Sequence, residues 1–177
     1  MIPFAIAAYI GGMAAVQAKT PATVSDFDLT RYLGKWYEIA RFDHRFERGL
    51  ENVTAEYILK DNGMVDVINS GWKGSKFKIA EGKARQKDPI SDPVQLEVSF
   101  FLWFYSDYNI MMLDDDYQVA LVGSSSPDYL WILSRTPSLG KEVIEMILSE
   151  ASERGYDTSK LIWVDQSFNI SQNRLPL

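Results

Sequence analysis

The sequence predicts an all-β domain that closes into an antiparallel barrel. Eight short segments follow one another at regular spacing, several alternate apolar with polar residues, and turn-forming residues separate them. The first segment opens with Gly34-Lys35-Trp36, and the last long one ends at Arg135. This pairing is typical of a barrel with a capped floor. Such a barrel has a hollow middle, which is where we expect its function to reside.

The strands are justified by their period and by the turns between them. Before the first strand, residues 28–34 predict a short helical turn that ends at Gly34. The strongest hairpin signal is 61–63, Asp-Asn-Gly, because Asn and Gly adopt the positive φ that tight turns need. The eight predicted strands are 36–42, 53–59, 64–69, 77–85, 95–101, 108–113, 117–123 and 129–135.

Two of these strands are apolar on both faces, at 110–113 and 130–133, so something must cover the outside of the barrel there. Residues 136–138, Thr-Pro-Ser, predict a helix start, and Gly155 predicts its end. Apolar residues recur between them at helical spacing, namely Val143, Ile144, Ile147 and Leu148. We therefore expect one C-terminal helix packed outside the barrel.

A short ninth strand is predicted at 161–164, and the polar tail at 165–177 is expected to be loosely attached. Residues 1–18 are uncharged, largely apolar and end in Ala-Val-Gln-Ala before Lys19. A spanning helix needs about 20 apolar residues, so this segment fits a secretory signal peptide cleaved after Ala18. Residues 19–177 then form a single domain, and we expect a periplasmic or secreted protein.

Composition excludes several classes of function. The net charge of −6, without a Lys/Arg stripe, argues against a nucleic-acid partner. The chain has no cysteine, which removes thiol nucleophiles, disulfides and zinc–thiolate sites. His44 is the single histidine, and no Gly-x-Ser-x-Gly motif is present. We therefore expect neither an enzyme, nor a metal site, nor a cofactor.

Several apolar side chains share the parity that points into a closed barrel. Eight strands enclose an interior just wide enough either to be filled by side chains or to hold one small ligand, so both a solid core and a ligand-lining role stay open. The residues on this face are Tyr57, Leu96, Val98, Phe100, Tyr108 and Trp131.

The loop after the first strand should sit at the open mouth of the barrel. The rings of Phe42 and Phe46 there would grip an acyl chain, and His44 would contact a headgroup or simply form surface. The arginines of the same segment would contact an anionic headgroup, or else be solvated; they are Arg41, Arg45 and Arg48. A dense aromatic run at 100–105 either docks a partner or a membrane, or packs on the chain's own tail or N-terminal segment.

Two blocks of sequence carry a family resemblance. Residues 34–50, Gly-Lys-Trp-Tyr-Glu-Ile-Ala-Arg-Phe-Asp-His-Arg-Phe-Glu-Arg-Gly-Leu, and 129–137, Tyr-Leu-Trp-Ile-Leu-Ser-Arg-Thr-Pro, resemble the lipocalins, in particular the subgroup of the bacterial outer-membrane lipocalin, apolipoprotein D and the plant temperature-induced lipocalins. The resemblance implies an eight-stranded up-and-down barrel that holds one apolar ligand. It also implies a floor of Gly34, Trp36 and Arg135, with the guanidinium against the indole.

The resemblance implies binding and transport or storage of a fatty acid or a lysophospholipid in the cavity. The alternative is a stress-related protein with a filled barrel that docks a partner or membrane through the aromatic run at 100–105. Bacterial members are commonly acylated on a cysteine after the signal peptide, and this chain has Ala18-Lys19-Thr20 there. We therefore do not carry over that anchor, while peripheral contact with the outer membrane and a homodimer stay open.

Overall fold

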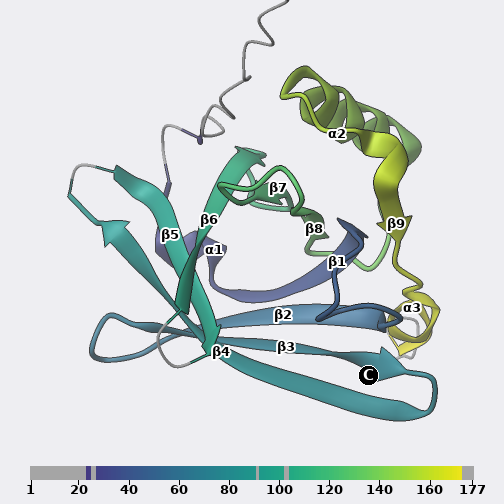
Figure 1. The fold of residues 1–177 in the computed structure, drawn as a ribbon, viewed down its shortest axis with the longest axis horizontal. Coiled ribbons are helices and arrows are strands. Elements are labelled where there is room, and N and C mark those ends of the chain that lie inside the picture. The colour runs from purple at the N-terminus through teal and green to yellow at the C-terminus, as the bar shows by residue number, and fades with distance from the viewer. Residues whose placement is uncertain (1–22, 25–26, 91, 102–103, 173–177) are drawn as a thin grey trace, which may run out of the picture.

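The computed structural model describes residues 23–24, 27–90, 92–101 and 104–172 of the 177-residue chain. These residues form a nine-stranded antiparallel sheet with the order β2-β3-β4-β5-β6-β7-β8-β1-β9, with the two C-terminal helices outside it (Figure 1). The strands are β1 Gly34–Phe42, β2 Glu51–Leu59, β3 Val65–Lys73, β4 Lys76–Asp88, β5 Asp92–Phe101, β6 Phe104–Leu113, β7 Val119–Gly123, β8 Leu130–Ser134 and β9 Leu161–Trp163. The helices are α1 Leu29–Tyr32, α2 Lys141–Glu153 and α3 Ser167–Gln172, with a 3₁₀ turn, η1, at Thr158–Lys160.

The sheet closes because β1 pairs with two neighbours along its length. Its first half, from Gly34 to Tyr37, pairs with β2, and Tyr37 to Arg41 pair with β8. Where β2 diverges from β1, β9 takes its place and pairs with the end of β1 from Ala40 to Phe42. The result is the predicted eight-stranded up-and-down barrel with a short ninth strand outside it and a C-terminal helix.

Two apolar clusters lie on the two sides of the barrel wall. The outer cluster packs β1, β7 and β8 against Ile147 and Ala151 of α2, which explains the strands that are apolar on both faces. The inner cluster fills the floor end of the barrel. It contains Tyr32, Trp36, Ala55, Tyr57, Val65, Val67, Ala84, Leu96, Ile110, Tyr117, Ala120, Val122 and Leu133, with Val98, Tyr108 and Trp131 packed against it.

The strand register of β8 follows the predicted alternation. Leu130 and Ile132 belong to the outer cluster under α2, and Trp131 between them belongs to the inner one. Successive side chains of a strand point to opposite faces, so the interior position of Trp131 follows directly from the covered positions of its neighbours.

Several boundaries differ from the sequence prediction, and three differences shape the fold. The β3–β4 hairpin runs on to Lys73 and Lys76, past Gly71, so its turn lies beyond the predicted strand ends. Helix α2 starts only after Gly140, which serves as its N-cap. The tail is not loosely attached over its described part, since α3 is fixed to β2 through the Phe168 backbone N–H, which donates to Asn52 Oδ1 at 3.0 Å.

Candidate functional site: the barrel interior

The floor of the barrel is closed by Trp36 and Arg135. Trp36 is fully buried, and the Arg135 guanidinium carbon lies 3.9 Å from the centre of its ring. The Trp36 indole N–H donates to the Tyr32 carbonyl at 2.8 Å. Arg135 also donates to the carbonyls of Lys35 and Arg31, each at 2.8 Å. These bonds tie α1 and the ends of β1 and β8 together.

Gly34 begins this floor with a φ of +88°, a backbone conformation that residues with a Cβ rarely adopt. A Cβ at this position would also meet Arg135 Nη1 at 3.6 Å, which is an ordinary contact distance. The glycine of the Gly-x-Trp pattern is therefore required by its backbone angle rather than by lack of space.

Three tyrosine hydroxyls form a polar patch just above the floor. The Tyr108 hydroxyl lies 2.7 Å from those of Tyr32 and Tyr57, one on each side. Burial is the largest influence on all three groups and raises each pKa above its ordinary value, so the hydroxyls stay neutral. The patch can offer a hydrogen bond to a polar end of a bound molecule in an otherwise apolar interior.

The walls above the floor are not completely filled. Val65, Val67, Ala84 and Leu96, near the floor, are almost fully buried. Val98, Tyr108 and Trp131 belong to the same inner cluster but keep solvent-accessible surface. Accessible surface on side chains that face into a closed barrel indicates unfilled space next to them.

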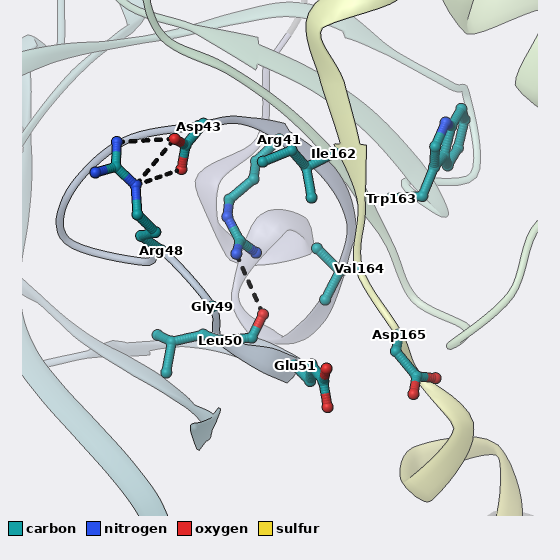
Figure 2. A pocket seen from close by; sticks show the side chains of 10 residues that line it. All are labelled: Arg41, Asp43, Arg48, Gly49, Leu50, Glu51, Ile162, Trp163, Val164 and Asp165. Carbon is teal, nitrogen blue, oxygen red and sulfur yellow. Dashed lines mark hydrogen bonds and ion pairs between the residues drawn. The ribbon is translucent and has the colours of Figure 1, made fainter. Parts of the chain in front are cut away.

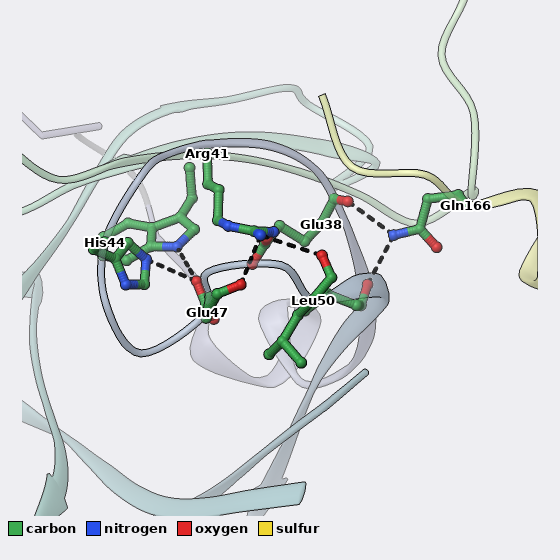
Figure 3. A network of polar contacts seen from close by, with 8 residues as sticks. Glu38, Arg41, His44, Glu47, Leu50 and Gln166 are labelled. Atoms are coloured by element: carbon green, nitrogen blue, oxygen red, sulfur yellow. Dashed lines mark hydrogen bonds and ion pairs between the residues drawn. The ribbon is translucent and has the colours of Figure 1, made fainter. Parts of the chain in front are cut away.

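The side chain of Glu47 holds the loop at 43–50 next to this space through its contacts with Trp131 and His44 (Figure 3). The Trp131 indole N–H donates to Glu47 Oε2 at 3.1 Å, and His44 Nε2 lies 2.8 Å from the same oxygen. The His44 contact is close but poorly aligned for a hydrogen bond, so we treat it as an electrostatic contact. The Tyr129 ring stacks on Trp131 with 5.8 Å between centroids. Trp131 thus lies between the interior and the loop.

A buried charged group anchors the loop from the barrel side. Arg41 Nη1 lies 2.5 Å from Glu38 Oε1, and Nη2 donates to the carbonyls of Glu47 and Leu50 at 2.7 and 3.2 Å. Gln166 Nε2 donates to the carbonyls of Glu38 and Val53 at 2.8 and 2.9 Å, as Figure 3 shows in part. The cluster joins β1, β2, the loop and the segment before α3.

The two carboxyl groups of this cluster have opposite pKa shifts. Burial, followed by repulsion from Glu47, raises the pKa of Glu38 well above its ordinary value despite the nearby Arg41. Burial acts in the same direction on Glu47, but its contacts with His44, Trp131 and Arg41 together lower its pKa. The two carboxyl groups interact, and the opposite shifts make protonation easier at Glu38 than at Glu47.

A hollow of about 310 Å³ lies on the other side of the loop, between it and β9 (Figure 2). Arg48 and Asp43 pair there at 2.8 Å, and Arg41 points to the Leu50 carbonyl. The lining also includes Glu51 and Asp165, so carboxylates outnumber guanidiniums. This balance disfavours an anionic headgroup at Arg41 or Arg48.

The third arginine of this segment lies elsewhere: the Arg45 guanidinium is over the Phe46 ring, 4.8 Å from its centre.

The structure brings together five of the seven predicted lining residues in the inner cluster. They are Tyr57, Leu96, Val98, Tyr108 and Trp131. Phe100 lies near the end of β5 and does not belong to the cluster. Its ring carbon Cδ1 is 2.7 Å from the position that a Cβ on Gly82 would take, so the ring occupies that space. Within the aromatic run at 100–105, Leu102, Trp103 and the side chains of Phe101 and Phe104 lie outside the described residues, while Tyr105 packs under Arg85 at 4.3 Å.

The position predicted for Phe42 is wrong. Its ring lies in the outer cluster, 6.1 Å from that of Tyr156. The reason is a β-bulge between Glu38 and Ala40, which shifts the register of β1 against β8 by one residue. Beyond the bulge the inward position passes to Arg41, which pairs directly with Trp131.

Sequence reasoning did not identify Tyr32 or the cluster of Glu38, Glu47 and Gln166. Glu38 and Glu47 lie within the distinctive block at 34–50, but no local signal distinguishes them from surface carboxylates. Across the part of the chain that the structure describes, no three His, Asp or Glu side chains are grouped as a metal site, and no helix is long and apolar enough to span a membrane.

Comparison with known proteins agrees with this geometry. Residues 27–166 match the lipocalin-like domain. The chain is 47% identical over 172 residues to the outer membrane lipoprotein Blc of Escherichia coli strain K12, covering 94% of this chain and 96% of that protein. It is 35% identical to apolipoprotein D of Bos taurus over 156 residues, which is 82% of this chain and 80% of that protein.

Among solved structures, insecticyanin of the tobacco hornworm Manduca sexta superimposes with a TM-score of 0.66 at 25% identity, covering 83% of this chain and 86% of that one. Sequence and fold therefore agree over the barrel, its outer helix and its ninth strand. The chain belongs to the lipocalin family, in the subgroup related to the Blc proteins and to apolipoprotein D.

Proposed function

We propose that this protein binds a lipid with a single acyl chain, a fatty acid or a lysophospholipid, in the barrel interior and transports or stores it. Membership of the lipocalin family supports the broader role of binding and transporting a small hydrophobic ligand. Family members are generally binding proteins, and we propose no catalytic step. The observation that carries the proposal is the accessible surface on Val98, Tyr108 and Trp131, which face into a closed barrel.

The width of the barrel argues for a single chain. Eight strands leave room for one slender ligand, because side chains from the opposite walls approach each other closely. In this proposal the acyl chain contacts Leu96, Val98 and Trp131, and the tyrosine hydroxyls around Tyr108 bond to any polar group that reaches them. We propose Tyr57 and Phe100 as further contacts of the ligand.

The proposal extends to the place where the protein works. Residues 1–18 would be removed as a signal peptide, which leaves the domain at 19–177 in the periplasm or outside the cell. The relatives named Blc are outer membrane lipoproteins, which supports a location in the cell envelope. We propose that any contact with the outer membrane is peripheral.

Mass spectrometry of an organic extract of the purified protein tests the function. We expect one single-chain lipid per protein molecule in the wild type and a strongly reduced amount in Trp131→Lys. Trp163→Lys is the matched control, because Trp163 is half-exposed on β9 and should leave the lipid content unchanged. The proposal is wrong if the wild-type extract holds no lipid and the delipidated protein takes up none.

The alternative, a filled barrel that docks through the aromatic run at 100–105, makes the opposite prediction. An apolar fluorophore would then not enter the barrel, and Trp131→Lys would fail to fold because its ammonium group would be desolvated in a filled core. Uptake of one fluorophore per molecule, lost in a folded Trp131→Lys variant, would exclude this alternative.

A further inference from the structure

The β3–β4 hairpin ends in a segment whose charge contrasts with the rest of the protein. Residues 67–80, around the turn at 74–75, contain Lys73, Lys76 and Lys78 and no acidic residue, although the whole chain carries a net charge of −6. The nearest acid across the sheet is Glu51, which stands opposite Trp72. The three lysines are solvent-exposed.

The outer face of the same hairpin is apolar and exposed. Trp72 and Phe77 are direct cross-strand partners with ring centroids 5.1 Å apart, and the ring of Phe168 from α3 lies 6.1 Å from Trp72. Ile79 shares this face, since it lies two residues beyond Phe77 on β4. Phe77 is 51% exposed, Ile79 59% and Phe168 47%. We call these four residues the hairpin patch.

Lysines and aromatic residues alternate along the tip. Lys73 pairs with Lys76 next to the turn, Trp72 with Phe77 one step back, and Gly71 with Lys78 after that. Because side chains alternate along a strand, the three lysines lie on the barrel side of the hairpin, and Trp72, Phe77 and Ile79 lie on its outer side. Long lysine stems let the ammonium groups next to the turn reach beyond it. Cations and rings therefore lie at the same end of the hairpin, on its two faces, and an approach of the tip end-on presents both.

This combination fits the surface of an anionic bilayer better than it fits water. Tryptophan favours the boundary between lipid headgroups and acyl chains. Lysines near an anionic leaflet each strengthen attachment by about fivefold in the partition constant. Phe77, Ile79 and Phe168 are about half-exposed, so each leaves apolar surface available to a membrane.

We propose that the tip of the β3–β4 hairpin, Lys73, Lys76 and Lys78 with the hairpin patch, docks the protein on an anionic lipid membrane. The tip lies at the same end of the barrel as the loop at 43–50, since Lys73 Cε is 3.7 Å from the position of a Cβ on Gly49. Docking would bring that end of the barrel, with Trp131 below the loop, to the lipid surface. Membrane attachment itself does not depend on whether the barrel holds a lipid.

Vesicle flotation tests the proposal on the full-length mature chain. Vesicles of equal parts phosphatidylcholine and phosphatidylglycerol are compared with phosphatidylcholine alone. We expect binding to the mixed vesicles that weakens with salt, and a loss of about 25-fold in the partition constant for the double variant Lys73→Gln/Lys76→Gln. Phe77→Ser should also weaken binding, although its charge is unchanged.

Matched controls carry the same changes elsewhere. Lys141→Gln/Lys160→Gln removes two exposed charges from α2 and η1, and Ile90→Ser removes a side chain that is 92% exposed in the β4–β5 turn. Both should bind as the wild type does. Equal losses in the controls, or no binding to mixed vesicles, would overturn the proposal. So would a wild-type dimer that Phe77→Ser converts to a monomer without any effect on vesicle binding.

Discussion

Replacing Trp36 by alanine should strongly destabilise the barrel. The side chain is fully buried, stacks under the Arg135 guanidinium at 3.9 Å and donates to the Tyr32 carbonyl at 2.8 Å. Truncating a buried tryptophan costs about 3–5 kcal/mol, which already includes the lost packing and the cavity. In a domain of this size each kcal/mol lowers the melting temperature by about 2–4 °C, so a decrease of about 6–20 °C is expected.

Thermal unfolding followed by circular dichroism measures this decrease. Trp163→Ala is the matched control, because Trp163 is 49% exposed and its truncation should change the free energy of unfolding by about 0.5 kcal/mol or less. If Trp36→Ala melts within about 2 °C of the control, the indole does not hold the floor together and the argument about the barrel floor is wrong.

Three further predictions concern residues in and around the buried cluster next to the loop at 43–50. Trp131→Lys should fold, because Glu47 offers the ammonium a partner, but its affinity for a fatty acid should fall by about tenfold or more, as a binding titration would reveal. The free energy of unfolding of the wild type should fall as the pH drops from about 4.5 through the lowered folded pKa of Glu47, because that carboxylate loses its contacts on protonation. Urea titrations between about pH 6 and pH 3 should show a smaller loss of unfolding free energy in Glu47→Gln. Equal losses in the two proteins would contradict the assignment. Gln166→Ala should lower the free energy of unfolding by about 2 kcal/mol in urea titrations, since the buried carbonyls of Glu38 and Val53 lose their donor. An unchanged urea midpoint would show that water replaces the lost amide group.

The strands and their hairpins were predictable because they depend on period and turn chemistry, whereas closure into a barrel was predicted from the pattern of Gly34, Trp36 and Arg135 and from the family resemblance. The alternation of Val53, Ala55 and Tyr57 fixes the inward face of β2, and the turn at 61–63 fixes its connection to β3. The same reasoning placed Trp131 inside and its neighbours under α2. These features follow from local sequence.

The site was less predictable, because two features depend on pairing between distant segments. The bulge between Glu38 and Ala40 appears only when β1 is matched against β8, and it exchanges the positions of Phe42 and Arg41. The burial of Glu47 depends on Trp131, which lies 84 residues later. Charged residues in a loop are usually solvated, so no local signal distinguishes these from surface groups.

The position of the tail was missed for a related reason. Its polar composition suggested loose attachment, but Gln166 and Phe168 bond to groups on β1 and β2 that are more than a hundred residues away. A buried glutamine that satisfies two carbonyls stabilises the structure through hydrogen bonds, which hydrophobic periodicity does not reveal.

Titration of delipidated protein with a fluorescent fatty acid tests the central claim most directly. We predict saturable binding of one molecule per chain with a Kd of about 1 μM or tighter, displacement by a lysophospholipid, loss in Trp131→Lys and full retention in Lys73→Gln/Lys76→Gln. No saturable binding below about 100 μM, or binding that Trp131→Lys leaves unchanged, would contradict a ligand site inside the barrel.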